Sequence, residues 1–418
     1  MMTTPCRTHI YLSGKGYSLV ELLIVMVVFI VVIMISSSAF NTILTNSTQQ
    51  VKSSESNIQG VVGLEIMRSD LEGTGYGLPW CQSFVADWAE SNEAANDLAN
   101  GIAPTAFNDT NNPTKSEIYS QESNKTKGYL QGPRAIQSAT ATGANAWENG
   151  RDYLVIKSTI SGMNRAAKKW SYINYSGGTT WKTKTWGGTD DFVSGDRLIT
   201  LDAVDHRLIG SSTTSVDFSY SLPSTLAPNS SFVPATSDLS YLLYGVDSAS
   251  NLSFPYNRVD YYIKRPAVRS NGTNNMPDRC AIGTGILYKA NLNHSDRKVT
   301  QYPLLECVAD MQVVYALDTT ALDVAPVGGV NFNCDQSCLS AYTAEQIRKM
   351  IKEIKVYILT HEGQKDKSYT YPSSTIQVGE PGQGRTYDLT QLDTIGNDWK
   401  YYRWKVYTMI VKPKNLNN

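Results

Sequence analysis

The stretch Ser13–Ser38, "SGKGYSLVELLIVMVVFIVVIMISSS", decides how this chain is organised. It contains fourteen consecutive apolar residues, Leu22–Ile35, and Glu21 stands directly before them. A helix over 17–35, rising 1.5 Å per residue, would be roughly 28 Å long, which matches the hydrocarbon core of a bilayer. Because a backbone in lipid must satisfy its own hydrogen bonds, we predict a membrane-spanning helix here. A carboxylate in such a helix costs about 3 kcal/mol, so Glu21 is expected to have a functional role.

The residues before the apolar run carry positive charge only. Arg7, His9 and Lys15 lie there, with no acidic residue among them. The positive-inside rule therefore predicts that this end stays in the cytoplasm while the C-terminal bulk crosses the membrane. A plain single-pass anchor would fit, and so would a secretory signal peptide cleaved at the small residues Ser36–Ala39. Neither interpretation explains Glu21.

The segment Gly16–Glu21, "GYSLVE", resembles the processing site of type IV prepilins and pseudopilins. In that family the pattern is Gly, a bulky apolar residue, a small residue, two apolar residues and Glu, followed by a long apolar helix. A dedicated peptidase cuts after the glycine and methylates the new terminal amine. The resemblance implies a leader peptide at 1–16, cleavage between Gly16 and Tyr17, and N-methylation of Tyr17, which stands where phenylalanine is more usual.

The same resemblance implies that Glu21 acts in assembly. Cleavage would create an ammonium at Tyr17, at the positive end of the helix dipole. Tyr17 and Glu21 are four residues apart, so they share a helix face and a pair within one chain is one option. The family resemblance implies the other option, in which Glu21 pairs with the Tyr17 ammonium of a neighbouring subunit. The sequence alone leaves both pairings open.

The helix is predicted to continue well beyond the membrane. Apolar residues between Phe40 and Val62 recur at spacings of three, four and seven among polar residues, which is typical of an amphipathic helix. Gly73, Gly75 and Gly77 then supply the conformations that end a helix. We therefore predict one helix over 17–73, roughly 80 Å long, with 17–36 in the membrane.

The rest of the chain, 74–418, is predicted to form a periplasmic or extracellular globular domain rich in strands. Alternating apolar and polar residues with many β-branched and aromatic side chains predict strands at 151–159, 196–202, 215–222, 258–265, 284–292, 307–317, 355–363 and 401–412. A capping box at Thr343 and Gln346 predicts a short helix, with Ile347, Met350, Ile351 and Ile354 along one face. Residues 82–150 are polar and weakly periodic, so an irregular insertion is expected there. The predicted fold class is α+β, a long pilin helix packed on a largely antiparallel sheet.

Further segments resemble PilW-type minor pilins. They are "MRSDLEGTGYG" at 67–77, "YPLLECVADMQVVYALD" at 302–318, and the last two predicted strands with the basic-polar tail after them. In the first of these, Glu72 and Thr74 stand where Arg and Ala are typical of the family. The resemblance covers the anchor, the helix end and the C-terminal third of the chain.

The chain has six cysteines, Cys6, Cys81, Cys280, Cys307, Cys334 and Cys338. Export would place those after the leader in an oxidising compartment, where disulfides persist. The spacing of Cys334 and Cys338 makes them a candidate local disulfide. Five cysteines would follow the leader, so at least one is expected to stay unpaired or to bond to another chain.

An aromatic stretch at 170–188, "WSYINYSGGTTWKTKTWGG", predicts a hairpin or an exposed loop. A hairpin that packs its own aromatic side chains is the favoured interpretation. A surface that binds single-stranded DNA needs stacking aromatics and basic residues, and the only candidates are Trp170, Trp181 and Trp186 with Lys168, Lys169, Lys182 and Lys184.

The sequence carries no pattern of an active site. Glycine-rich phosphate loops, nucleophile elbows and zinc-ligand spacings are absent. His206, His294 and His361 stand in polar segments and are expected at the surface, and neither Asp190–Asp191 nor the pair Asp318 and Asp323 follows a calcium-loop spacing. The net charge of -1 argues against bulk binding of nucleic acid. We expect no enzyme, no cofactor and no metal.

The resemblance implies a PilW-type minor pilin of a type IV pilus, with a place in the initiating or tip complex. Such a protein is held in the inner membrane before assembly and is then part of the pilus at the cell surface. The partners that the resemblance implies are other minor and major pilins, the prepilin peptidase, the inner-membrane assembly platform and a tip adhesin, with no nucleic acid. The alternatives are a minor pseudopilin of a type II secretion system, a DNA-uptake (competence) pilin, or a tethered binding domain that never polymerises.

Overall fold

A computed structural model describes residues 16–82, 88–93, 102–109, 129–142, 149–177, 180–210, 218–221, 232–248, 250–266, 276–321, 331–393 and 396–416. The leader up to residue 15 and most of the expected insertion lie outside these ranges. The chain divides into two compact units, Met1–Ser54 and Glu55–Asn418.

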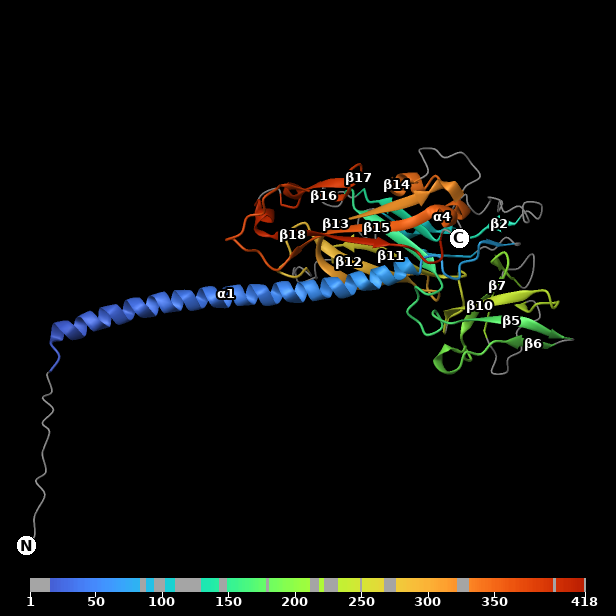
Figure 1. Cartoon of the computed structure of the whole chain (residues 1–418), viewed down its shortest axis with the longest axis horizontal. Coiled ribbons are helices and arrows are strands. Elements are labelled where there is room, and N and C mark those ends of the chain that lie inside the picture. The colour runs from blue at the N-terminus through green and yellow to red at the C-terminus, as the bar shows by residue number, and fades with distance from the viewer. Residues whose placement is uncertain are drawn as a thin grey trace, which may run out of the picture. The chain divides into compact units, whose positions relative to one another are not determined.

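The first long element is helix α1, Leu19–Glu72, which runs without a break through 54 residues (Figure 1). These bounds lie within two residues of the predicted ones. The helix ends where the glycines begin, because Gly75 and Gly77 adopt positive φ angles of 80° and 66°. A side chain at either position would be strained in this left-handed conformation, so glycine is the residue that fits.

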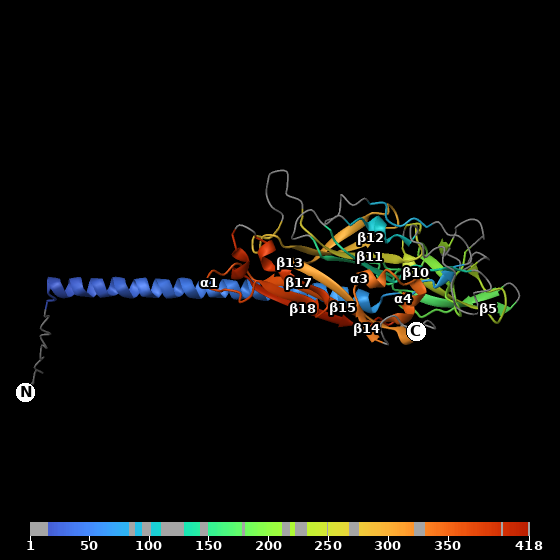
Figure 2. The same cartoon turned by 90° about the horizontal axis from the view of Figure 1, so that it is seen from above.

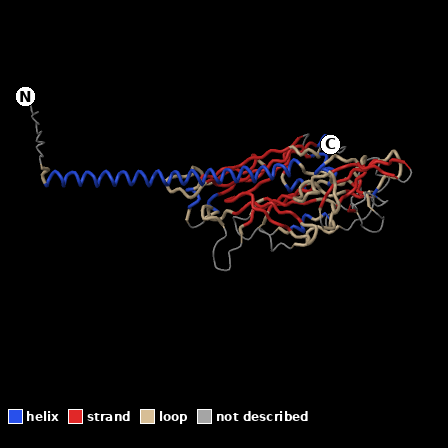
Figure 3. The backbone as a smooth tube through the Cα atoms, turned by 90° about the horizontal axis from the view of Figure 1, so that it is seen from below, coloured by secondary structure: helices blue, strands red, loops and turns tan. Residues whose placement is uncertain are grey.

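The second unit is built mainly from strands (Figure 3). These strands make up two large sheets and one small one. The first eight-stranded sheet has the order β2 (Leu130–Gln131), β1 (Cys81–Gln82), β8 (Arg207–Leu208), β7 (Arg197–Asp202), β10 (Ser240–Asp247), β5 (Trp170–Gly177) and β6 (Thr180–Thr183), with β9 (Ser219–Ser221) paired to β7. Its described pairs are antiparallel except β1 with β8.

The second eight-stranded sheet is antiparallel throughout its described pairs. Its order is β18 (Arg403–Val411), β15 (Ile351–Glu362), β13 (Val299–Asp318), β12 (Gly285–Leu292), β11 (Asn257–Lys264), β4 (Asp152–Ser158) and β3 (Ile136–Thr140), with β14 (Asn331–Cys334) paired to β13. A two-stranded sheet joins β16 (Thr375–Glu380) to β17 (Gln383–Asp388). Figure 2 shows β13, β15 and β18 side by side. The chain is therefore α+β, with a long apolar N-terminal helix and a large antiparallel β domain.

Three details differ from the sequence prediction. The strands belong to two large sheets instead of one. Ile136–Thr140, within the stretch predicted to be irregular, forms the edge strand β3, which is too short to give a periodic signal. The helix after Thr343, α4, spans Ala344–Met350, and β15 begins at Ile351, so Ile351 and Ile354 belong to a strand.

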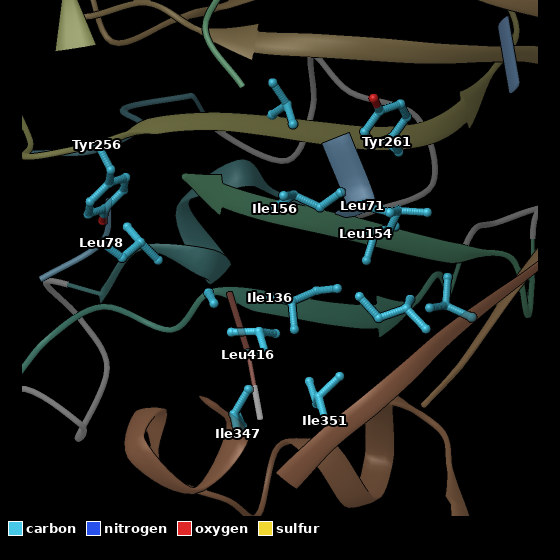
Figure 4. Packing of buried hydrophobic residues seen from close by; sticks show 14 of the residues in the cluster. Leu71, Leu78, Ile136, Leu154, Ile156, Tyr256, Tyr261, Ile347, Ile351 and Leu416 are labelled. Carbon is cyan, nitrogen blue, oxygen red and sulfur yellow. The ribbon is translucent and has the colours of Figure 1, made fainter. Parts of the chain in front are cut away.

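The main core of the second unit combines side chains from strands of the second sheet with the end of α1 and with α4. Figure 4 shows Leu71 of α1 beside Leu154 and Ile156 of β4. It also shows Ile136 of the neighbouring strand β3 on the side of the sheet where Ile347 of α4 lies. Burial of these side chains supplies about 25 cal/mol for each Å² of apolar surface removed from water.

Polar contacts fix the end of α1 to the second sheet. The buried carboxylate of Asp70 accepts a hydrogen bond of 2.5 Å from the Tyr261 hydroxyl on β11, and it forms an ion pair at 2.5 Å with Lys289 on β12. Gly63 packs so tightly that a Cβ atom there would lie 2.5 Å from the backbone oxygen of Leu304. The helix end is thus held at one position on the sheet.

Two pairs of cysteines are joined in the structure. Cys334 is bonded to Cys338, as their spacing predicts, and Cys280 is bonded to Cys307, a pairing that the sequence left open. Cys81 is buried and is the described cysteine outside both disulfides. This arrangement fits the odd number of cysteines expected after loss of the leader.

Candidate functional site

The candidate site is the start of α1, where the residues of the predicted processing motif lie. Ser18 precedes the first helical residue and acts as the N-cap, because its hydroxyl accepts a hydrogen bond of 3.1 Å from the Glu21 backbone N–H. The Ser18 carbonyl accepts from the Leu22 N–H at 3.2 Å, which closes the first turn. Glu21 therefore occupies the third position of the helix, in its first turn.

The capping role of Ser18 is a feature that the sequence analysis missed. A signal was present, because Ser18-x-x-Glu21 has the spacing of a capping box. In a complete capping box the Glu21 carboxylate would also accept from the Ser18 N–H. Among the described residues, however, that carboxylate has no hydrogen-bond or ion-pair partner. It remains available for another cation.

The helix that follows Glu21 exposes its apolar side chains on every face. From Leu19 to Ile35 the large apolar side chains are 49–81% exposed. The part of the chain that the structure describes holds one segment, Leu19–Thr48, that is long and apolar enough to cross a membrane. A helix that is apolar all around is expected in lipid or in the interior of a protein assembly.

The arrangement at this site suits docking more than chemistry. Tyr17 is 79% exposed and lies just before the cap, so a cut after Gly16 would leave a free amine at the helix N-terminus. Glu21 lies one turn further along, where the positive end of the helix dipole favours a carboxylate. An amine and a carboxylate that lie one helical turn apart can pair within the chain or between adjacent helices.

The aromatic stretch forms the hairpin β5–β6, which was the favoured prediction. Trp186 donates its indole N–H to the Trp170 carbonyl at 2.8 Å, and the two rings lie 5.0 Å apart. Lys169 is also occupied, since it forms an ion pair with Asp196 at 3.3 Å. Trp170 and Trp186 therefore contact each other and both stay exposed, while Trp181 donates its indole N–H to the Pro234 carbonyl at 2.9 Å, outside the hairpin.

The expectation that all three histidines lie at the surface is wrong. His294 and His361 are buried, and His206 is half-buried and stacks on Trp80 with a ring separation of 4.1 Å. His361 accepts a hydrogen bond from the Ala281 N–H at 2.9 Å. Their polar neighbours in the sequence suggested surface positions, but segments distant in sequence cover them.

Five charged side chains form a cluster buried in the second unit, which we call the ionic cluster: Glu90, Asp109, Lys157, Arg258 and Asp260. Lys157 contacts Asp109 at 2.5 Å and Glu90 at 3.3 Å, while Arg258 contacts Glu90 at 3.1 Å and Asp260 at 2.8 Å. Burial opposes ionisation, but Lys157 and Arg258 outweigh it and hold the pKa of the Glu90 carboxyl below its usual range.

The ionic cluster has a structural explanation. Glu90 and Asp109 belong to segments of the expected insertion, whereas Lys157 lies on β4 and Arg258 on β11. The ion pairs therefore attach those segments to the second sheet. Each basic group is paired with carboxylates at short range. The described ranges hold no group of three or more His, Cys, Asp or Glu side chains that could bind a metal ion.

Comparisons with models of protein families, with characterised proteins and with solved structures returned no match.

Proposed function

We propose that this chain is a minor pilin of a type IV pilus, of the PilW type. It is made as an inner-membrane precursor, cleaved between Gly16 and Tyr17, N-methylated at Tyr17 and built into the pilus. The observation that carries the proposal is the position of Glu21. It lies in the first turn of a long helix whose apolar side chains are exposed, one turn after the predicted cleavage site.

The assembly role of Glu21 follows from the cost of leaving it unpaired. A carboxylate in lipid costs about 3 kcal/mol, and it has no side-chain partner among the described residues. The Tyr17 ammonium of an adjoining subunit would neutralise it. Because the two groups are one helical turn apart, this pairing would also fix the stagger between neighbouring helices.

The large second unit supports a place in the initiating or tip complex. A globular unit spanning Glu55–Asn418 is easier to house at the end of a filament than to repeat along a tightly packed shaft. The proposed partners are other minor and major pilins, the prepilin peptidase and the assembly platform, with adhesion or motility as the process served. The role is structural, without enzymatic activity or a cofactor.

Substitution of the residue before the cut tests the proposal. In Gly16→Trp the peptidase is expected to be blocked, because a bulky side chain would occupy the place of the glycine at the scissile bond. The protein should then keep its precursor mass in the membrane fraction and be missing from sheared pili, both measured by immunoblot.

The matched control is Gly14→Trp, which places the same bulk two residues earlier in the leader. This variant should be processed and assembled like the unaltered chain. Sheared pili that contain normal amounts of the Gly16→Trp protein would refute the proposed processing.

A further inference from the structure

The ionic cluster brings an amine and a carboxyl group into direct contact at a site closed to solvent. The side chain of Lys157 is fully buried and that of Asp109 is 2% exposed, and the Lys157 Nζ atom lies 2.5 Å from Asp109 Oδ2. The carboxylate of Glu90, which is also fully buried, lies 3.3 Å from the same Nζ atom. One lysine amine is therefore held between two carboxyl groups, one that it can react with and one that can take its proton.

Hydrogen bonds hold the three groups in place. The Asp109 backbone N–H donates to Glu90 Oε1 at 2.7 Å, and the Tyr256 hydroxyl donates to the same oxygen at 2.6 Å. The Lys157 Nζ atom also donates to the Phe107 carbonyl at 3.0 Å. Groups that are held in contact in this way react far faster than the same groups free in solution, because their orientation is already fixed.

The surroundings make the Asp109 carboxyl group reactive. Burial raises the pKa of this carboxyl, and the negative charge of Glu90 adds to the effect, against the opposing influence of Lys157. Its Oδ1 atom is buried and has no hydrogen-bond partner among the described residues. An amine attacks a protonated carboxyl group, whose carbon is electrophilic, and not a carboxylate. Glu90 is ionised beside Arg258 and Lys157, so it can accept a proton.

From this geometry we propose that Lys157 and Asp109 condense to an isopeptide bond, with Glu90 as the proton carrier. Glu90 takes one proton from the Lys157 ammonium, and the freed amine attacks Cγ of the protonated Asp109 carboxyl. The new bond joins Nζ to Cγ, the hydroxyl leaves as water with a second proton from the nitrogen, and Glu90 then releases the first proton. An ammonium and a carboxyl group thus yield an amide, one water and one proton, with no exchange of electrons and no further reactant.

The buried site also favours the product. In water an ammonium and a carboxylate are stabilised by solvation, but burial removes this solvation. The amide replaces them with a single neutral group. It joins a segment of the expected insertion to β4 across a sequence separation of 48 residues. A cross-link restricts the unfolded chain, as a disulfide does, so this bond locks the insertion onto the second sheet.

A second buried ion pair serves as a matched control within the same chain. Lys289 Nζ lies 2.5 Å from Asp70 Oδ2, and both side chains are at most 10% exposed. The Tyr261 hydroxyl donates to Asp70, but no second carboxylate pairs with Lys289 among the described residues. This pair is expected to remain an ion pair, because it lacks a proton acceptor although its contact is equally short.

Mass spectrometry of the full chain purified from membranes tests the proposal, and its result does not depend on pilus assembly. After reduction of the disulfides, the chain should be lighter by one water molecule than its sequence from the measured N-terminus, with any methyl group included. Digestion should yield a branched peptide that joins Asp109 to Lys157, and trypsin should no longer cut after Lys157. No branched peptide should join Asp70 to Lys289.

Two variants test the role of Glu90. Glu90→Gln keeps the size of the side chain but removes the proton acceptor, which should slow the condensation on the order of a hundredfold. Freshly made Glu90→Gln protein should therefore keep its full mass, with its fold compared by circular dichroism. The control Asp70→Asn should still lose one water molecule.

The mass of the unaltered chain decides the matter even if Glu90→Gln fails to fold. A full mass, together with tryptic peptides that end at Lys157, would overturn the inference. A branched peptide that forms equally fast in correctly folded Glu90→Gln would overturn the proposed mechanism.

Discussion

Replacement of Glu21 by alanine is expected to leave cleavage after Gly16 intact and to remove the protein from assembled pili. The variant lacks the carboxylate that would neutralise the Tyr17 ammonium of the adjoining subunit. If that pairing is worth the roughly 3 kcal/mol that an unpaired carboxylate costs in lipid, incorporation should fall on the order of a hundredfold. The measurement is the number of copies in sheared pili relative to the processed protein in the membrane.

Two control variants separate pairing between subunits from other roles of Glu21. Glu65→Ala removes a carboxylate from the same helix at an exposed position, where it pairs with Arg68 at 3.6 Å, and should assemble normally. Ser18→Ala removes the N-cap at a cost of about 1 kcal/mol and should reduce incorporation far less than Glu21→Ala does. Equal defects in Ser18→Ala and Glu21→Ala would mean that Glu21 serves the capping box of its own chain. Normal incorporation of Glu21→Ala would defeat the assembly role altogether.

Loss of the central lysine of the ionic cluster should be the largest effect on stability. Lys157→Met removes a buried ammonium that pairs with Asp109 and Glu90, and it leaves Arg258 as the one basic group of the cluster against three carboxylates. Breaking a buried pair on one side costs about 3–5 kcal/mol, because the remaining charge is desolvated without compensation. The full chain is therefore expected to unfold at a much lower denaturant concentration. Tryptophan fluorescence measures the midpoint of this transition.

The companion variants test the physical reason for that loss. Addition of Asp109→Asn to Lys157→Met removes one of the uncompensated charges and should recover about 1–2 kcal/mol. Lys414→Met makes the same substitution in a pair whose lysine side chain is 74% exposed, with Glu72 at 2.7 Å, and should cost less than about 1 kcal/mol. If the denaturant midpoint of Lys157→Met lay as close to that of the unaltered chain as the midpoint of Lys414→Met does, the cluster would contribute nothing to stability.

Much of the fold could be predicted because it follows from local patterns in the sequence. The apolar run and the glycines after it set the bounds of α1. Alternation along segments such as 258–265 and 284–292 predicted β11 and β12. Pairing could not be predicted in the same way. Strands β10 and β11 are neighbours in the chain, yet they belong to different sheets, and no local pattern distinguishes them.

The long-range polar contacts were also beyond sequence reasoning. Lys157 lies in a strand that was predicted correctly, but its partner Asp109 is 48 residues away in a stretch that was expected to be irregular. His294 likewise stands among polar residues and is nevertheless buried. At the candidate site, Gly16, Tyr17 and Glu21 came from a family resemblance, and the structure added the cap at Ser18. Short motifs with a fixed spacing are visible in a sequence, whereas clusters assembled from distant segments are not.

The most direct test of the central claim is mass spectrometry of the N-terminus of the protein purified from membranes and from sheared pili. The account predicts a chain that begins at Tyr17 and carries one methyl group on its α-amine. A chain that begins at Phe40, as a secretory signal peptide would leave, or one that keeps its leader, would contradict it.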